Sequence, residues 1–376
     1  MTALAAITVP QWGLTMEEGT VAEWHKAVGD PVAPGEAVCD VETSKIANVV
    51  EAQATGTLVR IVADTGATLP VGGLLAVLAD GPADDAAIDA FVSDFQASFT
   101  PVEAGEASAN EPLTVDVDGR TISYRHAAPA DGAGALPVVL LHGFGGDKDN
   151  WLFNISAIAA DRPVYAPDLP GHGASSKDVG DGTLDDLARA VAGFMVALGL
   201  QRAHLVGHSM GAAVALTLAG QDTGRVASLT LIAPAGLGET INGDYIAGFV
   251  AADRRKAMKP VLQMLFADAG LVTRDMVNDV LKYKRLDGVD TALKAIAQAV
   301  FPGGRQAAGF RDALPGLDMP VLALWGADDA IANAGDADGL NGAEVLLLPG
   351  IGHMPHMEAA GEVNARLTAH LASADG

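Results

Sequence analysis

Short apolar runs, separated by glycine, proline and aspartate, fill the first 80 residues of the chain. Runs of this length with frequent turn residues predict β-strands joined by tight turns. The segment GDPVAPG at 29–35 resembles GATLPVG at 66–72, and each copy leads into an apolar strand. Two similar halves predict a small barrel or sandwich with pseudo-twofold symmetry over residues 1–80.

Residues 81–112 have a different composition, rich in alanine, serine and proline, with seven acidic and no basic side chains. This composition predicts a linker. Inside it, apolar side chains recur at helical spacing and predict a short amphipathic helix: Ile88, Phe91, Val92, Phe95 and Phe99. Such a helix can pack on one of its own domains or dock on a partner subunit, and both alternatives stay open.

From residue 113 to the end at 376, strands alternate with helices, which is the pattern of an α/β sheet. Two strands near 112–118 and 120–126 predict an antiparallel edge. The remaining elements are buried strands at 137–141, 163–166, 203–206, 226–232, 320–325 and 344–348, and helices at 183–198, 210–220 and 357–373. About residues 236–315 the pattern is helical only, which predicts a lid over the C-terminal edge of the sheet.

Composition narrows the classes of function. The net charge of −24 argues against nucleic acids and anionic membrane surfaces as partners. Residues 236–318 nevertheless hold 11 of the 23 Lys and Arg against 10 acids, so this segment is where an anionic substrate could bind. The sequence shows no signal peptide, no apolar run of roughly 18 residues and no metal-ligand pattern. The single cysteine, Cys39, lies in an apolar strand and fits a reducing compartment, which predicts a cytoplasmic protein.

Gly207-His208-Ser209-Met210-Gly211 stands between the strand 203–206 and the helix 210–220. A sharp strand–turn–helix elbow needs small residues on both sides of the serine, and Gly207 and Gly211 supply them. The helix N-terminus also favours negative charge near the serine oxygen. These features predict that Ser209 is the nucleophile of an acyl-transfer site.

A second motif, His142-Gly143-Phe144-Gly145-Gly146, follows the strand 137–141. A glycine-rich loop in this place predicts an oxyanion hole built from the backbone N–H groups of Phe144 and Met210. Each such donor stabilises a transition state by about 3 kcal/mol. The simpler interpretation, a glycine-rich turn, does not explain why this loop and the elbow occur together.

The base and its orienting acid are expected after the last two strands. Asp328 and Asp329 both follow the strand 320–325. The spacing Gly-x-x-Asp from Gly326 resembles the α/β-hydrolase pattern and implies Asp329 as the acid, with Asp328 as its alternative. His353 is the predicted base, and His356 is interpreted as a packing histidine. The order Ser209, Asp329, His353 is the order of an α/β-hydrolase. His172 and His208 belong to loop and elbow motifs and receive no role in proton transfer.

Residues 113–373 resemble the α/β-hydrolase superfamily, through His142-Gly143, the segment DLPGHG at 168–173, the elbow and the Asp/His pair. In the first domain, Lys45 lies in Glu42-Thr43-Ser44-Lys45-Ile46, at a turn between two strands, and resembles the modified lysine of a lipoyl domain. Biotin carriers usually place methionine on both sides of this lysine, whereas Ser44 and Ile46 stand here. The resemblances imply an all-β lipoyl domain (1–80), a linker (81–112) and an α/β-hydrolase domain (113–376) with a helical lid.

The combination of the two domains is similar to the acetyltransferase component of the acetoin dehydrogenase complex. That resemblance implies lipoate on Lys45, coenzyme A as co-substrate, and acetyl transfer between them through Ser209, His353 and Asp329. It also implies thiamine-diphosphate-dependent acetoin-cleaving subunits and a dihydrolipoyl dehydrogenase as partners, and a homo-oligomer. The cations of the lid either bind coenzyme A phosphates or form solvated helix faces.

Two rival hypotheses remain at this point. In the first, the triad transfers acyl groups to water, and the lipoyl domain serves only to localise an esterase or thioesterase. In the second, the α/β-hydrolase domain is a scaffold and the chain is only a carrier. Dependence of turnover on coenzyme A separates the three functions.

Overall fold

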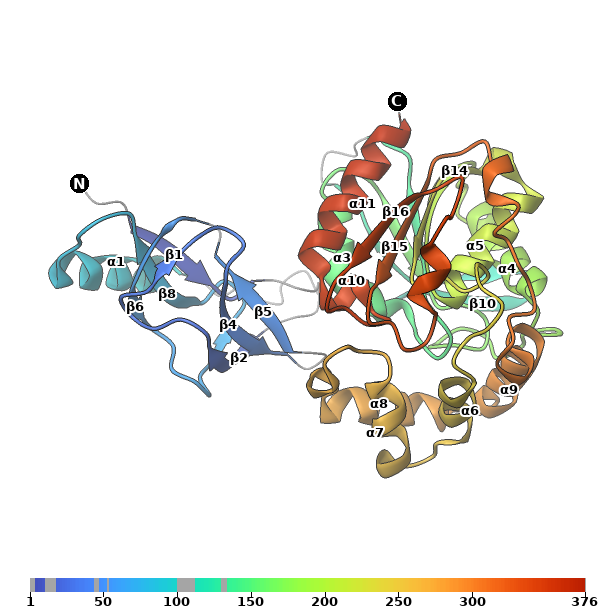
Figure 1. Ribbon diagram of the computed structural model, residues 1–376, viewed down its shortest axis with the longest axis horizontal. Helices are drawn as coiled ribbons and strands as arrows, with labels where there is room; N and C mark the ends of the chain where they lie inside the picture. Colours follow the sequence, from blue (N-terminus) through green and yellow to red (C-terminus); the bar gives the residue numbers. More distant parts are fainter. Residues whose placement is uncertain are drawn as a thin grey trace. The chain divides into compact units, whose positions relative to one another are not determined.

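The computed structural model describes residues 4–10, 18–43, 47–52, 54–99, 112–129 and 134–375. The chain divides into two compact units, Met1–Ser108 and Ala109–Gly376, which are described separately below (Figure 1). The limits predicted from the sequence, 1–80, 81–112 and 113–376, stay predictions.

The first unit is built from two four-stranded sheets. One has the strand order β1 (Leu4–Thr8), β8 (Leu74–Ala79), β6 (Gly56–Ile61) and β3 (Pro31–Val32). The other has the order β5 (Ala47–Glu51), β4 (Ala37–Glu42), β2 (Glu18–Trp24) and β7 (Thr68–Pro70). All pairings within both sheets are antiparallel. The expected all-β sandwich is therefore confirmed.

The sequence repeat of the first unit is visible in the backbone. Gly29 and Gly66 both have positive φ, at 102° and 88°, and so do Gly35 and Gly72, at 80° and 79°. Residues with a Cβ rarely adopt these angles, which explains why glycine occupies both copies. The amide of Gly35 donates to Ala52, and the amide of Gly72 makes the corresponding bond to Val9. The two copies of the sequence repeat thus adopt the same backbone turn, and the pseudo-twofold symmetry stays a prediction.

Apolar side chains from both sheets form the core of this unit, including Val38, Val41, Leu58 and Leu75. Cys39 is fully buried among them, and burial raises the pKa of its thiol to about 12. The cysteine is therefore a packed strand residue, as its sequence context predicts.

The helix predicted after the sandwich is α1 (Asp85–Ser98), which packs against β8. Asp84 caps its first turn by accepting a hydrogen bond from the amide of Ala87 at 2.7 Å. Ile88 is buried, and the guanidinium of Arg60 bonds to Asp89 at 2.8 Å. Of the two alternatives for this helix, the structure shows packing on its own unit.

The second unit contains an eight-stranded sheet with the order β16-β15-β14-β13-β11-β12-β10-β9. Strands β11 to β16 are parallel, and β9 and β10 form an antiparallel edge next to β12. The strands are β9 (Leu113–Val117), β10 (Arg120–Ala127), β11 (Val138–Leu141), β12 (Val164–Pro167), β13 (Ala203–His208), β14 (Val226–Ile232), β15 (Val321–Gly326) and β16 (Glu344–Leu348). Every strand expected from the sequence is present.

Helices cover both faces of this sheet. On one face, α3 (Leu152–Ala159) and α11 (Ala360–Asp375) lie together, and on the other face α4 (Leu184–Ala197) packs against α5 (Met210–Gln221) (Figure 1). Among the described residues, no helix is long and apolar enough to cross a membrane. The resulting three layers bury β11, β13, β14 and β15 completely. The α/β-hydrolase fold class is confirmed.

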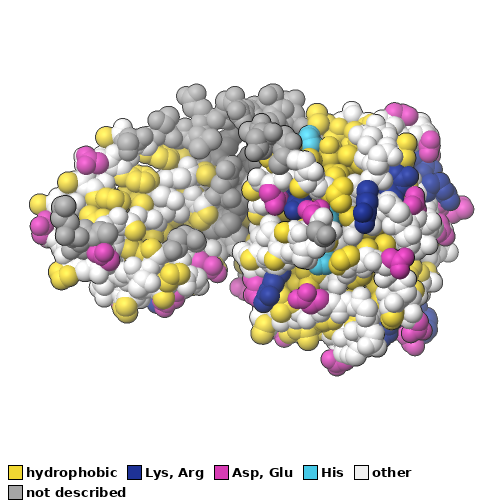
Figure 2. All heavy atoms as spheres, turned by 90° about the horizontal axis from the view of Figure 1, so that it is seen from above, with side chains coloured by type: hydrophobic (Ala, Val, Ile, Leu, Met, Phe, Trp, Pro, Cys, Tyr) yellow, Lys and Arg dark blue, Asp and Glu magenta, His cyan; other side chains and the backbone are white. Residues whose placement is uncertain are grey.

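Between β14 and β15 the chain leaves the sheet and forms a helical cap. It consists of α6 (Gly243–Ala251), α7 (Arg255–Gln263), α8 (Arg274–Lys284) and α9 (Val289–Val300). The hydroxyl of Tyr283 in α8 donates to the carbonyl of Gly171 at 2.7 Å, so the cap is fastened to the loop after β12. Figure 2 shows acidic and basic side chains interspersed on the face that it displays.

Candidate active site

The turn between β13 and α5 carries Ser209. Its backbone has φ 52° and ψ −117°, a conformation that serine rarely adopts. A Cβ on Gly207 would lie 2.5 Å from the backbone of Ala212, and one on Gly211 would lie 2.1 Å from the carbonyl oxygen of Leu141. Only glycine fits at either position, and this close packing explains the two glycines of the sequence motif.

Two hydrogen bonds hold the strained conformation of Ser209. Its amide donates to the carbonyl of Ile232 at 2.9 Å, and its carbonyl accepts from the amide of Ala235 at 3.1 Å. Ile232 is the last residue of β14, the neighbouring strand, and Ala235 lies three residues after it. The sheet therefore stabilises the elbow from the side.

His353 and Asp329 form a buried hydrogen-bonded pair at the C-terminal ends of β15 and β16. The Nδ1–H of His353 donates to Oδ2 of Asp329 at 2.8 Å, and their side chains are 2% and 0% exposed. The other carboxylate oxygen of Asp329 accepts the amides of Ile331 and Ala332. Asp328, the alternative acid, is exposed. Of the two aspartates, the structure therefore pairs Asp329 with the histidine.

The backbone of His353 is also held on both sides. Its amide donates to the carbonyl of Leu265 in the cap at 2.8 Å, and its carbonyl accepts from Nε2–H of His208 at 2.8 Å. Burial, with the neighbouring His356 and His353 as further causes, lowers the pKa of His208 well below 6.5. His208 is thus a neutral hydrogen-bond donor to the predicted base.

The loop with His142 and Phe144 is positioned by the segment DLPGHG at 168–173. Nε2 of His142 accepts the amide of Leu169 at 2.9 Å, and Asp168 forms a buried ion pair with Lys148 at 2.8 Å. Within the described part of the chain, the amides of Phe144 and Met210 have no acceptor. Both predicted oxyanion donors are therefore available for a ligand.

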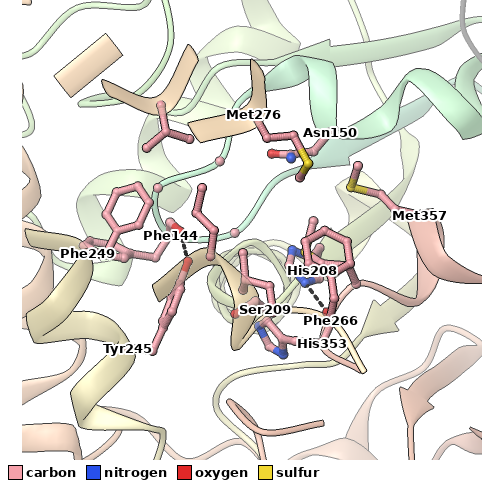
Figure 3. Close-up of a pocket in the computed structure, with 17 residues that line it drawn as sticks. Phe144, Asn150, His208, Ser209, Tyr245, Phe249, Phe266, Met276, His353 and Met357 are labelled. Carbon is pink, nitrogen blue, oxygen red and sulfur yellow. Dashed lines mark hydrogen bonds between the residues drawn. The ribbon is translucent and has the colours of Figure 1, made fainter. Parts of the chain in front are cut away.

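A small pocket joins these groups (Figure 3). Its volume is about 80 Å³, and Ser209, His353 and the loop 143–146 all line it. Its remaining walls come mainly from the cap and are apolar: Tyr245, Phe249, Leu262, Leu265, Phe266, Met276 and Val280. The hydroxyl of Tyr245 donates to the carbonyl of Phe144 at 3.3 Å, the bond drawn in Figure 3. The cap thus encloses the site and contacts the oxyanion loop directly.

His356, interpreted from the sequence as a packing histidine, is fully buried. Its ring lies between those of Trp151 and His208, tilted against both, with centroid distances of 4.6 Å to each. Burial lowers the pKa of His356 to about 3, and in the described structure neither ring nitrogen has a partner. These features agree with a packing histidine.

A second chain of serine, histidine and aspartate lies at the opposite edge of the sheet. Nδ1 of His204 bonds to the hydroxyl of Ser228 at 2.8 Å, and Nε2 bonds to Asp375 at 3.0 Å. Ser228 and His204 are both 0% exposed and lie near the N-terminal ends of their strands. A substrate cannot reach this serine, so the triad of residue types alone does not define a site.

The predicted carrier lysine belongs to the hairpin of β4 and β5. These strands pair from Ala37 opposite Glu51 to Glu42 opposite Ala47, so residues 43–46 connect them. Lys45 itself lies outside the described residues. The structure contains the paired strands on either side of it, β4 and β5.

The sequence matches two described families. Residues 137–360 match the family described as "alpha/beta hydrolase fold", and residues 5–78 match the one described as "Biotin-requiring enzyme". The chain is also similar to a meta-cleavage product hydrolase from Pseudomonas fluorescens, with a TM-score of 0.63 and 20% identity, over 70% of this chain and 98% of that one. At this identity the likeness concerns the fold alone.

Two relatives match nearly the whole chain. One from Pseudomonas putida is 49% identical, over 99% of this chain and 99% of the relative, and one from Cupriavidus necator is 46% identical, over 97% and 96%. Both are named dihydrolipoyllysine-residue acetyltransferase component of acetoin cleaving system.

Fold, elbow and pocket define the second unit as an α/β-hydrolase, joined in one chain to a biotinyl/lipoyl-type carrier domain. Within that class, the chain belongs to the family of acetyltransferase components of acetoin cleaving systems. This membership confirms the resemblance seen in the sequence and the acyltransferase class of enzyme.

Three residues near the site carry no signal that the sequence motifs reveal. Tyr245 and Phe249 lie on α6, and Glu358 ends the short helix α10 (Pro355–Glu358). Tyr245 of the cap bonds to Phe144, which lies 101 positions earlier in the sequence. Glu358 lies five residues after His353, but it belongs to none of the motifs.

Proposed function

We propose that this protein moves an acetyl group from a dihydrolipoyl-lysine to coenzyme A through Ser209, His353 and Asp329. One observation carries the proposal: the buried Ser209 and His353 line the same small pocket, Asp329 holds His353 from behind, and the chain also has a lipoyl-type carrier domain. The names of the two full-length relatives support the same reaction.

The described carrier hairpin fits a lipoyl group on Lys45. The paired strands β4 and β5 leave only residues 43–46 to connect them, which suits a modification site at the end of a hairpin. Ser44 and Ile46 favour lipoate over biotin as the group on Lys45. A lipoyl group would supply the thiol that brings the acetyl group to the site as a thioester.

In the first half of the reaction, Ser209 attacks the thioester carbonyl. The hydroxyl proton passes to Nε2 of His353, because Asp329 already holds Nδ1. The amides of Phe144 and Met210 donate to the oxyanion that forms. The carbon–sulfur bond then breaks, the sulfur takes the proton from His353, and the acetyl group stays on Ser209.

In the second half, His353 takes the proton of the coenzyme A thiol, whose sulfur attacks the acetyl carbon on Ser209. The same two amides stabilise the oxyanion, and Ser209 leaves with the proton that His353 returns. Asp329 favours the charged imidazolium in both halves. The reaction is a thioester exchange and needs no oxidant.

The cap supplies the feature that separates transfer from hydrolysis. A thiol must reach acetyl-Ser209 while water is kept away. The apolar wall of Tyr245, Phe249, Phe266 and Met276 surrounds a volume of only about 80 Å³. A pocket of this size suits a short acyl chain, and its apolar wall offers water few hydrogen bonds.

Further elements of the proposal rest on family membership. The partners would be thiamine-diphosphate-dependent acetoin-cleaving subunits and a dihydrolipoyl dehydrogenase, in a cytoplasmic complex with several copies of this chain. The exposed Arg254, Arg255, Lys256 and Lys259 at the start of α7 are available for the phosphates of coenzyme A. The rival function is release of acetate to water by the same triad.

The test measures products from acetyl-dihydrolipoamide with purified full-length protein. Acetyl-coenzyme A and free acetate are followed with and without coenzyme A, for the parent and for Ser209→Ala. Acetyl-coenzyme A should form only with coenzyme A and should be lost in Ser209→Ala. Ser228→Ala, which removes the buried serine of the second Ser-His-Asp chain, is the matched control and should keep the parent rate. Acetate release independent of coenzyme A would favour the hydrolase instead.

A further inference from the structure

Glu358 occupies an unusual place beside the predicted base. It ends α10, five residues after His353, and its carboxylate accepts three backbone amides. Oε1 accepts Gly352 at 3.0 Å and Met354 at 3.2 Å, and Oε2 accepts Ala267 at 2.9 Å. One side chain therefore joins the segment around His353 to a segment of the cap.

The three consecutive amides around His353 are all held in this way. Glu358 accepts those of Gly352 and Met354, and the carbonyl of Leu265 accepts that of His353 at 2.8 Å. Each of the three amides in the loop that carries His353 therefore has an acceptor. Its backbone position depends on Glu358 and on the cap together.

The backbone of the His353 loop lies close against the backbone of the cap. A Cβ on Gly352 would lie 2.5 Å from the amide nitrogen of Ala267 and 3.0 Å from the carbonyl oxygen of Leu265. Leu265 and Phe266, in the same cap segment, line the pocket. The wall of the pocket and the loop of His353 are therefore in direct contact.

Helix capping explains only one of the three bonds of Glu358. Glu358 lies in the first turn of the four-residue α10, and its bond to the amide of Met354, the N-cap residue, caps this short helix. The other two bonds go to the amides of Gly352 and Ala267, which lie outside α10. Burial raises the pKa of this carboxyl group, against the opposing effect of its three N–H donors. The three hydrogen bonds therefore offset part of the free-energy cost of burying this carboxylate.

We propose that Glu358 is a positioning residue that fastens the backbone of His353 to the cap segment Leu265–Ala267. Asp329 then orients the imidazole ring, and Glu358 fixes the backbone that carries it. Closure of the pocket wall and alignment of His353 with Ser209 become one event. This inference rests on the proposed function, in which His353 activates Ser209.

The first test uses a fluorophosphonate, which reports on Ser209 without coenzyme A or an acetyl donor. The serine oxygen bonds to phosphorus, fluoride leaves, and His353 takes the hydroxyl proton. Labelling of the full-length parent is compared with Glu358→Ala and Glu358→Gln. The matched control is Glu362→Gln, an exposed glutamate in the first turn of α11.

We expect kinact to fall about 10- to 100-fold in Glu358→Ala and less in Glu358→Gln, because misplacement of a catalytic group costs rates of that order. Glutamine keeps one acceptor but turns an N–H donor toward the other amides. KI should stay within about twofold and the melting temperature of Glu358→Gln near that of the parent. Folded variants that label at the parent rate would overturn the inference. A parent that does not react would instead overturn the role of Ser209, and this inference with it.

A second test asks whether Glu358 couples the two segments. Hydrogen exchange is measured on the full-length parent and Glu358→Gln at the amides of residues 352–354 and 267. Faster exchange in both segments supports the coupling. Exchange that rises around His353 alone would contradict the proposed link to the cap.

Discussion

Asp328 and Asp329 are adjacent in sequence but differ in every physical respect that matters for catalysis. Asp329 is buried against His353, and two backbone amides hold its second oxygen. Asp328 is exposed, and its amide is used in a bond to the carbonyl of Ile351. The pair therefore provides a test in which one residue serves as the control for the other.

Replacing Asp329 by asparagine should reduce acetyl transfer by about 10⁴-fold while the protein stays folded. The amide oxygen can still accept the bonds from Ile331 and Ala332, but the charge that orients and stabilises protonated His353 is lost. Asp328→Asn should keep the parent rate. Steady-state kinetics with acetyl-dihydrolipoamide and coenzyme A measure both variants. A comparable loss of activity in Asp328→Asn would contradict the assignment of Asp329 as the acid.

Phe249 limits the space next to the oxyanion loop. A Cβ on Gly145 would come within 2.4 Å of its ring, so Phe249 closes the pocket at this point. In Phe249→Leu, the ratio of butanoyl to acetyl transfer from 4-nitrophenyl esters should rise about tenfold, within the range that one or two methylene groups contribute. Phe194→Leu removes the same side-chain volume from the core between α4 and the sheet, and should leave the ratio unchanged. An unchanged ratio in Phe249→Leu would show that other residues set the chain length.

Sequence reasoning reached the site residues that lie in short contiguous motifs. Ser209, Phe144 and Met210 follow from local glycine spacing, and His353 from its place after the last strand. Tyr245 and Phe249 could not be found in this way, because helical periodicity shows which face of α6 is apolar but not what it contacts. Long-range contacts of the cap decide the shape of the pocket.

At the scale of elements, the duplicated turns of the carrier domain are the most informative feature. Gly35 and Gly72 have the same φ, but only Gly72 has a neighbour, since a Cβ there would lie 3.2 Å from the ring of Phe99. The two positions therefore separate backbone strain from side-chain contact.

Gly35→Ala should destabilise the first unit by about 1–2 kcal/mol, the cost of a left-handed conformation for a residue with a Cβ. Gly72→Ala should cost more, because the new methyl group also meets Phe99. Adding Phe99→Ala to Gly72→Ala should return the loss to the value for Gly35→Ala. Hydrogen exchange of the amides in β4 and β8, measured in the full-length protein, gives the free energies. Equal losses in the two single variants would mean that Phe99 does not pack at this turn.

The order of strands and helices was largely predictable, because β-strands of a doubly covered sheet are continuous apolar runs. The exceptions have a physical reason. Helix α3 is short, and its segment LFNISAIA is apolar on most sides, so no helical period distinguishes it from a buried strand. The expected last helix, 357–373, is instead two helices, α10 and α11, which are separated at Ala359 with φ −129° and ψ 44°.

At the scale of the whole molecule, buried histidines determine how stability responds to acid. Burial is the largest cause that lowers the pKa of His142, His172, His208 and His356. In the unfolded chain these groups bind protons as the pH falls through 6.5, whereas in the folded protein they stay neutral. Stability is therefore complete above this pH and is lost as the pH falls below it.

The free energy of unfolding should decrease between pH 7 and pH 5, with up to about 1.4 kcal/mol per pH unit from each of these histidines. Glu358 and Asp336, whose pKa burial raises, act in the opposite direction and make the decrease smaller. Urea unfolding followed by the fluorescence of Trp151 and Trp325, both buried in the second unit, measures the slope. His356→Phe, which keeps an aromatic ring between Trp151 and His208, should reduce it. A free energy that is constant over this range would show that the histidines titrate in the folded state.

The bond between His204 and Asp375 has a consequence for the synthesis of the protein on the ribosome. The buried Arg162 and His204 receive their carboxylate partner from Asp375, which lies 213 and 171 positions further along the chain. His353 is translated only shortly before it, long after Ser209. The first unit, Met1–Ser108, is translated before any of these residues and can fold while they are still being added. The second unit completes the buried network around His204 only after Asp375 has left the ribosome.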